Sequence, residues 1–244
     1  MKLKKLFFLF AASALLFISC DYIKEKAGGI IDGVKGLATD DENVEPAELQ
    51  FWESYSGEEI AVTIIPALEN YSLESGRTDL SLMLTLDYNA WGAVVGYAQA
   101  ADTAAVSRIL EGAFEAGVFN RNEMRFAWGY YSVDGSMHEL YALVPDFDGT
   151  AAMDGNIIKE AKADFTQFSS APCISIELND DAARQFADLT GRNVGKPLPI
   201  VINGFVYSAP CVQSRIDGGK VEITGNFSQE DTERLAKMLN ACKK

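Results

Sequence analysis

The pair Asn203-Gly204 constrains the fold of this chain more than any other short segment. It lies between two apolar runs, Pro199–Ile202 and Phe205–Ser208. Asn-Gly is the pair that a type I′ turn favours, because both central residues of that turn need a positive φ. Such two-residue turns join antiparallel strands whose twist they match. The segment therefore predicts a tight β-hairpin in the C-terminal part of the chain.

A strand and a helix precede this hairpin. The run Cys173–Leu178 alternates along its length, which predicts a half-buried strand. Asn179 follows at the position of a helix N-cap, and Asp180 and Asp181 fall in the first turn, where the helix dipole favours negative charge. The apolar residues at helical spacing predict the buried face of this helix: Ala182, Ala183, Phe186, Leu189 and Thr190.

Another strand and a second helix follow the hairpin. Gly218-Gly219 marks a turn before the strand Val221–Thr224. Ser228 and Asp231 form a capping box that starts a final helix. This helix presents one apolar face, made of Leu235, Met238, Leu239 and Cys242. The order β-α-β-β-β-α predicts an α+β fold, with a mixed or antiparallel sheet and helices packed on one face.

The preceding part of the chain carries weaker signals. The expected elements are strands over 80–86 and 90–98, a helix over 102–117, a strand pair over 125–133 and 139–144, and a short helix over 157–164. Asp134-Gly135 would form the turn of the strand pair. The longer helix would bury Val106, Ile109, Leu110, Ala113 and Phe114.

Residues 1–20 have the form of a secretory signal, with lysines followed by an apolar run and Ser19-Cys20. The apolar run is shorter than the about 20 residues that span a bilayer. Cys20 resembles the lipidated cysteine of a bacterial lipobox. We therefore expect a lipoprotein signal peptide with Cys20 as the site of acylation, palmitate included. The alternative is an ordinary secretory signal that ends near a chance cysteine.

Residues 21–48 are rich in Gly, Lys and acidic residues and can bury little, which predicts a flexible tether. A lipid and a tether together predict a protein anchored in the cell envelope and facing the periplasm. The sequence leaves open whether the inner or the outer membrane holds it.

The formal net charge is −14, so the surface repels the phosphates of nucleic acids. No basic stripe or nucleic-acid motif offsets this charge, and nucleic acid is excluded as an expected partner. An acidic surface favours cationic partners, and it is also a common route to solubility.

Cysteine and histidine usage gives no sign of catalysis. Three cysteines follow Cys20, and their spacing matches no zinc pattern. Cys173 and Cys211 are the expected pair if a disulfide forms in the oxidising envelope; otherwise they are small buried side chains. The single histidine, His138, lies near a Gly-Ser turn signal without a nucleophile beside it. With no phosphate loop or nucleophile elbow either, we expect no metal, no cofactor and no enzymatic activity.

The last third of the chain resembles the head region of the first periplasmic domain of the protein-export factors SecD and SecDF. The resemblance is carried by the run from Asn193 to Asn240, which contains N-x-G-K, V-x-S-A-P, G-G and I-T-G-N-F motifs. The matching residues are Asn193, Gly195, Lys196, Gly204, Ser208, Ala209, Pro210, Gly218, Gly219, Thr224, Gly225, Asn226 and Phe227. Asn203 stands where the family usually has Asp, and both residues tolerate the turn conformation. A looser match reaches back to residue 49.

This resemblance implies an N-terminal part of the periplasmic-like domain over 49–160 and a head-like subdomain over 161–244. It implies contact with translocating, unfolded polypeptides or with the Sec translocase. The candidate contact or motif residues are Asn203, Gly204, Ser208, Ala209, Pro210, Gly218, Gly219, Gly225, Asn226 and Phe227. Two alternatives stay open: these residues define the fold alone, or the fold serves an envelope partner outside export.

Overall fold

The structure, a computed structural model, describes residues 44–89, 92–167 and 169–242. The described residues form one compact unit. It combines helices with sheets whose strands pair antiparallel, so the expected α+β class is confirmed. The expected signal peptide with Cys20, and the expected tether up to residue 43, lie outside the described residues.

A five-stranded sheet forms the centre of the N-terminal half. Its order is β2 (Glu53–Ser54), β6 (Met137–Val144), β4 (Val94–Gln99) and β3 (Leu84–Leu86), with β5 (Arg125–Trp128) also paired to β6. The expected pairing around Asp134-Gly135 is confirmed, because β5 and β6 are antiparallel and Gly135 has the positive φ of a turn, 88°.

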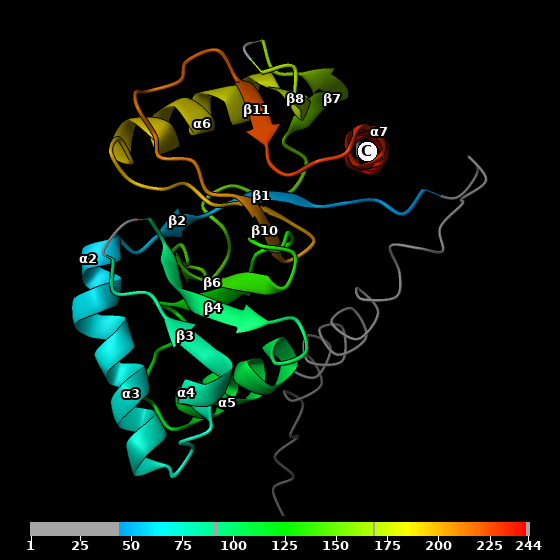
Figure 1. Cartoon of the computed structure of the whole chain (residues 1–244). Helices are drawn as coiled ribbons and strands as arrows, with labels where there is room; N and C mark the ends of the chain where they lie inside the picture. The colour runs from blue at the N-terminus through cyan, green and yellow to red at the C-terminus, as the bar shows by residue number, and fades with distance from the viewer. Residues whose placement is uncertain (1–43, 90–91, 168, 243–244) are drawn as a thin grey trace, which may run out of the picture. The chain divides into compact units, whose positions relative to one another are not determined.

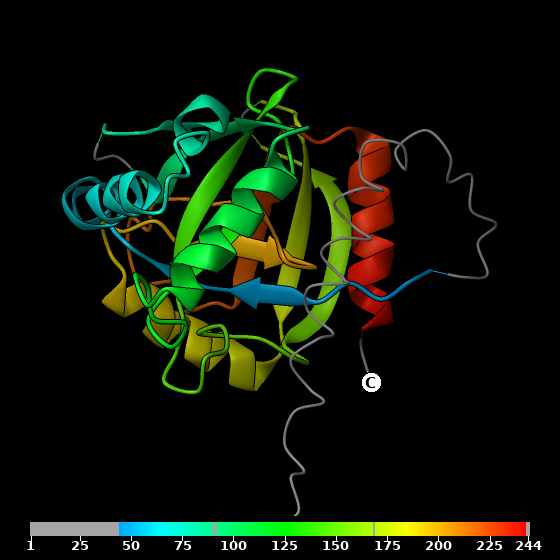
Figure 2. The same ribbon diagram turned by 90° about the horizontal axis from the view of Figure 1, so that it is seen from below.

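Helices cover one face of this sheet. They are α2 (Gly57–Glu59), a π-helical turn η1 (Ile60–Ile64), α3 (Ile65–Glu74), α4 (Leu80–Met83) and α5 (Thr103–Glu115). Helix α5 lies across the strands in Figure 2 and buries Val106, Ile109, Leu110 and Ala113, as its spacing predicts. One apolar cluster joins η1, α3, α4 and α5 to β3, β4 and β6.

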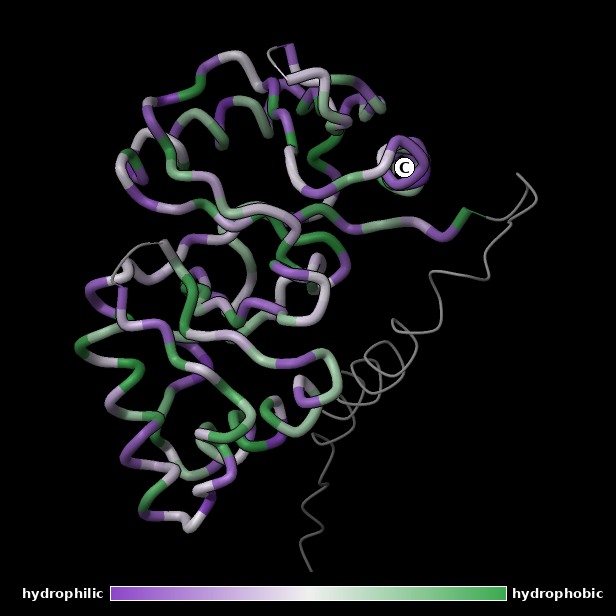
Figure 3. Tube along the Cα trace, viewed as in Figure 1, coloured by the Kyte–Doolittle hydropathy of each residue, from purple (hydrophilic) through white to green (hydrophobic). Residues whose placement is uncertain are grey.

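Two smaller sheets make up the C-terminal half. One has the order β1 (Leu49–Phe51), β9 (Ile200–Ile202) and β10 (Phe205–Ser208), and the other has the order β11 (Lys220–Thr224), β8 (Pro172–Leu178) and β7 (Ile158–Phe165). Helices α6 (Asp180–Arg192) and α7 (Gln229–Ala241) flank the space between these sheets in Figure 1. The hydrophilic and hydrophobic residues of α3 and α6 alternate along the tube in Figure 3.

The largest apolar cluster lies between the two three-stranded sheets and includes residues of α6 and α7. Strand β9 is buried on both faces, because Ile200 and Ile202 belong to this cluster while Val201 belongs to a further cluster that includes Tyr141 and Leu143 of β6. We expected the strands of the last third to share one sheet. They form two, because a strand with two apolar faces is most stable as a layer between other layers.

The segment expected as one strand over 80–86 is a helical turn, α4, followed by β3. The expectation of a strand was wrong for Leu80–Met83. Leu80 and Leu84 are both buried while Leu82 is 87% exposed. A spacing of four residues between buried side chains is that of a helix, and the leucines at every second position of this run hide it, because they imitate the alternation of a strand.

The segment expected as a helix over 157–164 is strand β7. It pairs along its length with β8. Its Lys, Glu and Ala residues favour a helix locally, but pairing with a distant strand outweighs that weak preference. This strand also runs across residue 160, where we placed the boundary between the two parts of the domain.

Candidate functional site

The Asn203-Gly204 turn has the predicted geometry. Its two residues have φ values of 50° and 82°, which confirms the type I′ turn. The Asn203 side-chain Oδ1 accepts a hydrogen bond from the backbone N–H of Glu48 at 2.9 Å, and the Asn203 N–H donates to the Glu48 carbonyl at 3.2 Å. Ala47 is fully buried. The turn therefore anchors the segment of this chain that precedes β1. Residues 47 and 48, which we expected in the tether, belong to the fold.

The Ser208-Ala209-Pro210 segment leaves the hairpin through an irregularity in the register between Val206 and Ser208. Ser208 and Ala209 are half-buried, and Pro210 is exposed. The Pro210 carbonyl accepts a hydrogen bond from Leu198 N at 3.0 Å. The segment is thus fixed through its backbone, and its outermost side chain faces solvent.

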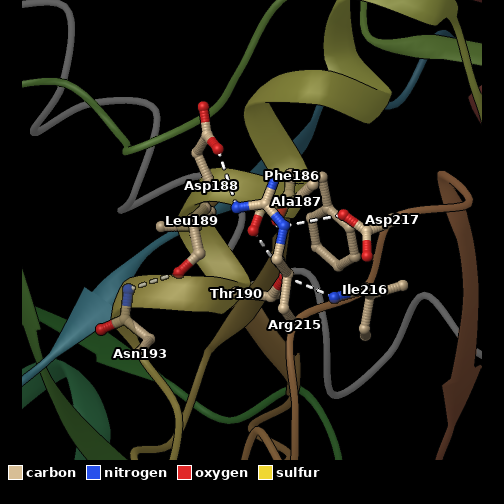
Figure 4. A network of polar contacts seen from close by, with 9 residues as sticks. All are labelled: Phe186, Ala187, Asp188, Leu189, Thr190, Asn193, Arg215, Ile216 and Asp217. Carbon is tan, nitrogen blue, oxygen red and sulfur yellow. Dashed lines mark hydrogen bonds and ion pairs between the residues drawn. The ribbon is translucent and has the colours of Figure 1, made fainter.

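The loop after this segment is fastened to α6 by an arginine (Figure 4). Arg215 donates from Nη1 to Asp188 Oδ1 at 2.9 Å and from Nε to Asp217 Oδ1 at 2.7 Å. All three side chains are largely exposed, so each ion pair adds little stability by itself. The pairs fix where the loop lies on the helix.

A buried hydroxyl holds the same loop from beneath. Thr190 is almost fully buried, and its Oγ1 donates to the Phe186 carbonyl at 2.8 Å while it accepts from the Ile216 N–H at 3.0 Å. We predicted Thr190 for the buried face of α6 without this role. A hydroxyl on an otherwise apolar helix face is the signal that could have indicated it.

The two glycines of the pair 218–219 have different roles. A Cβ at Gly218 would meet no atom within 4 Å, whereas a Cβ at Gly219 would lie 2.5 Å from the Ala183 Cβ. Gly219 also has a φ of 60°, and its carbonyl accepts from Leu178 N at 2.8 Å. Gly219 is therefore required by the fold, and Gly218 is exposed and open.

The I-T-G-N-F motif ends strand β11 and fills the core. Phe227 is 7% exposed and belongs to the largest apolar cluster. A Cβ at Gly225 would lie 3.1 Å from the Phe227 ring, so glycine gives the ring room. Asn226 is exposed.

An aromatic cluster, which the sequence analysis missed, surrounds Phe227. Tyr130 and Tyr207 stack with ring centroids 4.3 Å apart and planes at 12°, and Tyr131 meets the Phe227 ring edge-on at 5.3 Å. Burial raises the pKa of the Tyr131 and Tyr207 phenols. The Tyr131 hydroxyl is buried without a hydrogen-bond partner among the described residues. The repeated Tyr-Tyr at 130–131 is the only sequence signal of this cluster.

A second feature that we did not predict is the polar contact between β2 and the end of α6. Glu53 Oε1 accepts from Arg192 Nε at 2.6 Å and from Asn193 Nδ2 at 3.0 Å. Burial by itself would raise the pKa of Glu53, but these hydrogen bonds and the charges of Arg192 and Lys196 outweigh it and lower the pKa. Glu53 and Arg192 line a cavity of about 280 Å³ with Val144, Pro145, Asp146 and Ala152.

The cysteines and the histidine take structural positions. Cys173, Cys211 and Cys242 are free thiols, so the disulfide that we considered for Cys173 and Cys211 is not formed in the structure. Cys173 is buried in β8, and burial raises the pKa of its thiol. Cys211 is exposed and lies outside the named strands, in an isolated bridge with Pro197. His138 lies in β6, with Nδ1 at 2.9 Å from the Gly129 carbonyl oxygen.

Across the described residues, no group of three or more His, Cys, Asp or Glu side chains could hold a metal ion. The helices of the same part of the chain are too short or too polar to span a membrane. The motif residues have two kinds of role. Gly219 and Phe227 are required by the fold, whereas Pro210, Gly218 and Asn226 are exposed.

Comparison with known proteins gives a consistent match. Residues 139–243 match the family model of the SecDF P1 head subdomain. Protein translocase subunit SecD of Sebaldella termitidis is 44% identical over 93 residues, 38% of this chain and 23% of that protein. The same subunit of Rhodothermus marinus is 32% identical over 151 residues, 62% of this chain and 24% of that protein. The matched region thus spans about a quarter of the length of these relatives.

A solved structure described as "Structure and function of a membrane component SecDF that enhances protein export" aligns over 80% of this chain and 93% of its own, with 19% identity and a TM-score of 0.38. At that level of similarity, the assignment depends on the sequence matches. The C-terminal part of this chain, residues 139–243, belongs to the SecD/SecDF head-domain family.

Proposed function

We propose that this protein is a lipid-anchored, periplasm-facing accessory of protein export, which binds translocating polypeptides or the Sec translocase without enzymatic activity. The observation that carries the proposal is the family match over residues 139–243. The curated relatives that share this region are subunits of the protein translocase. A module of the same family in the same compartment would meet the same kinds of partner.

The exposed part of the motif set is the surface that we assign to partner contact. Pro210, Gly218 and Asn226 are exposed, while Gly219 and Phe227 are needed by the fold itself. The loop that carries Gly218 is fastened to α6 by Thr190 and Arg215. A preorganised loop loses little conformational freedom on binding, which favours affinity.

The charge of the protein supports a polypeptide partner with cationic segments. The net charge is −14, and such a surface attracts basic segments and accelerates their association at low salt. The expected lipid on Cys20 would hold the domain beside the membrane. Metabolic labelling with a palmitate analogue tests this anchor, and a Cys20→Ser variant should lose the label.

Photo-crosslinking in living bacteria tests the proposal, with a photoreactive amino acid at Gly218 or at Asn226. Both positions are exposed, whereas the same residue at Gly219 would clash with Ala183. Position 82 in α4 serves as a control, because Leu82 is 87% exposed on the opposite half of the fold.

Crosslinks from Gly218 or Asn226 to exported polypeptides or to translocase subunits, with few from position 82, are the expected result. Crosslinks from these two positions to other envelope proteins alone, or none from well-expressed variants, would contradict a role in export.

A further inference from the structure

The sheet β1-β9-β10, which contains the hairpin, is covered along both of its edges. Beside β10, the Tyr130 N–H donates to the Val206 carbonyl at 2.8 Å. Beside β1, Phe51 and Met153 exchange both backbone hydrogen bonds, at 2.9 and 3.1 Å. Covered edges cannot pair with another chain, so the hairpin itself is a poor site for strand addition.

The other three-stranded sheet is covered at its β7 edge by a side chain. The Asn240 side-chain amide accepts from the Ala161 N–H at 3.0 Å and donates to the Ala161 carbonyl at 2.7 Å. An amide that makes both bonds occupies the position that a neighbouring strand would take. The remaining edge of this sheet is β11, which stands next to β8 in Figure 1.

The register shows which backbone groups of β11 face outward. Leu178 N donates to the Gly219 carbonyl, so the backbone of Leu178 faces β11. In an antiparallel pair alternate residues face the same way, and Val221 and Ile223 therefore face β8. The backbone groups that face away from β8 belong to Lys220, Glu222 and Thr224.

This edge is accessible and unpaired. Lys220, Glu222 and Thr224 are exposed, while Val221 and Ile223 are buried in the core. Within the described residues, the outward backbone groups of β11 take part in no hydrogen bond. The edge therefore offers backbone donors and acceptors in the spacing of a β-strand.

We infer that the β11 edge binds an extended segment of an exported polypeptide, which adds to the sheet as a fourth strand. This inference rests on the proposed function. Recognition through the backbone is largely independent of sequence, which suits a partner whose sequence varies from one exported protein to the next. The outward side chains of Lys220 and Glu222 carry one charge of each sign, so the edge does not select strongly by charge.

A second copy of this chain, paired symmetrically about Glu222, is a poorer occupant. An antiparallel pair of β11 strands centred on Glu222, the middle residue of the strand, would place the two Glu222 side chains opposite each other. Like charges directly opposite in a sheet are destabilising.

Proline at position 222 tests the inference. The missing N–H would lie on the outer side of the strand, where the fold tolerates proline, and the ladder to β8 would remain. Glu222→Ala keeps the N–H and controls for the loss of the carboxylate. Ala163→Pro is the matched control on the opposite edge of the sheet. The backbone of Ala161 faces away from β8, toward Asn240, and that of Ala163, two residues further along β7, faces the same way.

The probe is a fluorescein-labelled short peptide of alternating threonine and valine, titrated into the full-length chain by fluorescence anisotropy. Glu222→Pro should weaken binding by about tenfold or more, since at least one backbone hydrogen bond is lost and the ring blocks its neighbour. Glu222→Ala and Ala163→Pro should bind as the unmodified protein does. A peptide with proline at its central positions should not bind, and this holds even if Glu222→Pro fails to fold.

Three outcomes would overturn the inference: no binding of the threonine-valine peptide, equal binding by Glu222→Pro, or equal losses in Glu222→Pro and Ala163→Pro. A dimer that Glu222→Pro converts to a monomer would show that a second copy occupies the edge. The in-cell crosslinks separate the two proposals. Crosslinks to exported chains that survive in folded Glu222→Pro leave the proposed function standing and reject the β11 edge.

Discussion

The side-chain amide of Asn240 hydrogen-bonds both backbone groups of Ala161, a residue distant in sequence, at 3.0 and 2.7 Å. The contact joins α7 to the outer edge of β7. A single side chain therefore closes one edge of the sheet while the β11 edge stays open. Only the β11 edge of this sheet can therefore pair with a further strand.

Replacement of Asn240 by Ala should lower the free energy of unfolding by about 1–2 kcal/mol. Two hydrogen bonds are lost, each worth about 1 kcal/mol, and water can partly replace them because the contact is half-buried. Urea denaturation checks the value, with Glu233→Ala on the same helix as an exposed control. An equal loss in both variants would mean that the amide adds nothing specific.

The two glycines of the Gly218-Gly219 pair should respond differently to Ala. Gly219→Ala should cost about 2 kcal/mol or more, because the new Cβ meets Ala183 at 2.5 Å and the φ is positive. Gly218→Ala has free space and should stay within about 0.5 kcal/mol of the parent protein. Urea unfolding of both variants decides. Similar values for the two would contradict the crowding at Gly219.

Loss of the Thr190 hydroxyl should loosen the loop on α6. Thr190→Val keeps the side-chain shape but leaves the Ile216 N–H without its acceptor, at a cost of about 1–2 kcal/mol. Amide hydrogen exchange at Ile216 should become faster. Thr190→Ser retains the hydroxyl and should protect this amide nearly as the parent does. Unchanged exchange in Thr190→Val would show that the loop is held by other contacts.

The stabilisation from Glu53 should depend on pH. Its pKa is lower in the folded protein than its usual value of 4.5, so its contribution to stability is present above pH 4.5 and is lost as the pH falls through the folded pKa. Glu53→Gln should therefore be less stable than the parent at pH 7, and the difference should shrink at pH 3.

Urea unfolding of both proteins at the two pH values measures this effect. Glu58→Gln, which changes an exposed carboxylate, serves as the control. A difference between Glu53→Gln and the parent that is the same at pH 7 and pH 3 would show that Glu53 acts through packing and not through its charge.

Much of the C-terminal half could be predicted from sequence because its signals are local. The Asn203-Gly204 turn, the Asn179 cap and the Ser228–Asp231 capping box each depend on residues a few positions apart, and all three have the predicted geometry. The family resemblance used the same region, and the family match over residues 139–243 confirms it.

The sequence by itself determined the local elements of this protein: the hairpin, the capped helices and the glycine positions. Tertiary structure alone decided the rest. Strand β7 forms against its local helix preference because β8 pairs with it, and β9 becomes a middle layer because it has apolar neighbours on both faces. Tertiary structure also decided which sheet edge stays open, since Asn240 covers Ala161 through a contact between residues far apart in sequence. No local pattern encodes such a contact, because its partners meet through packing of the whole chain.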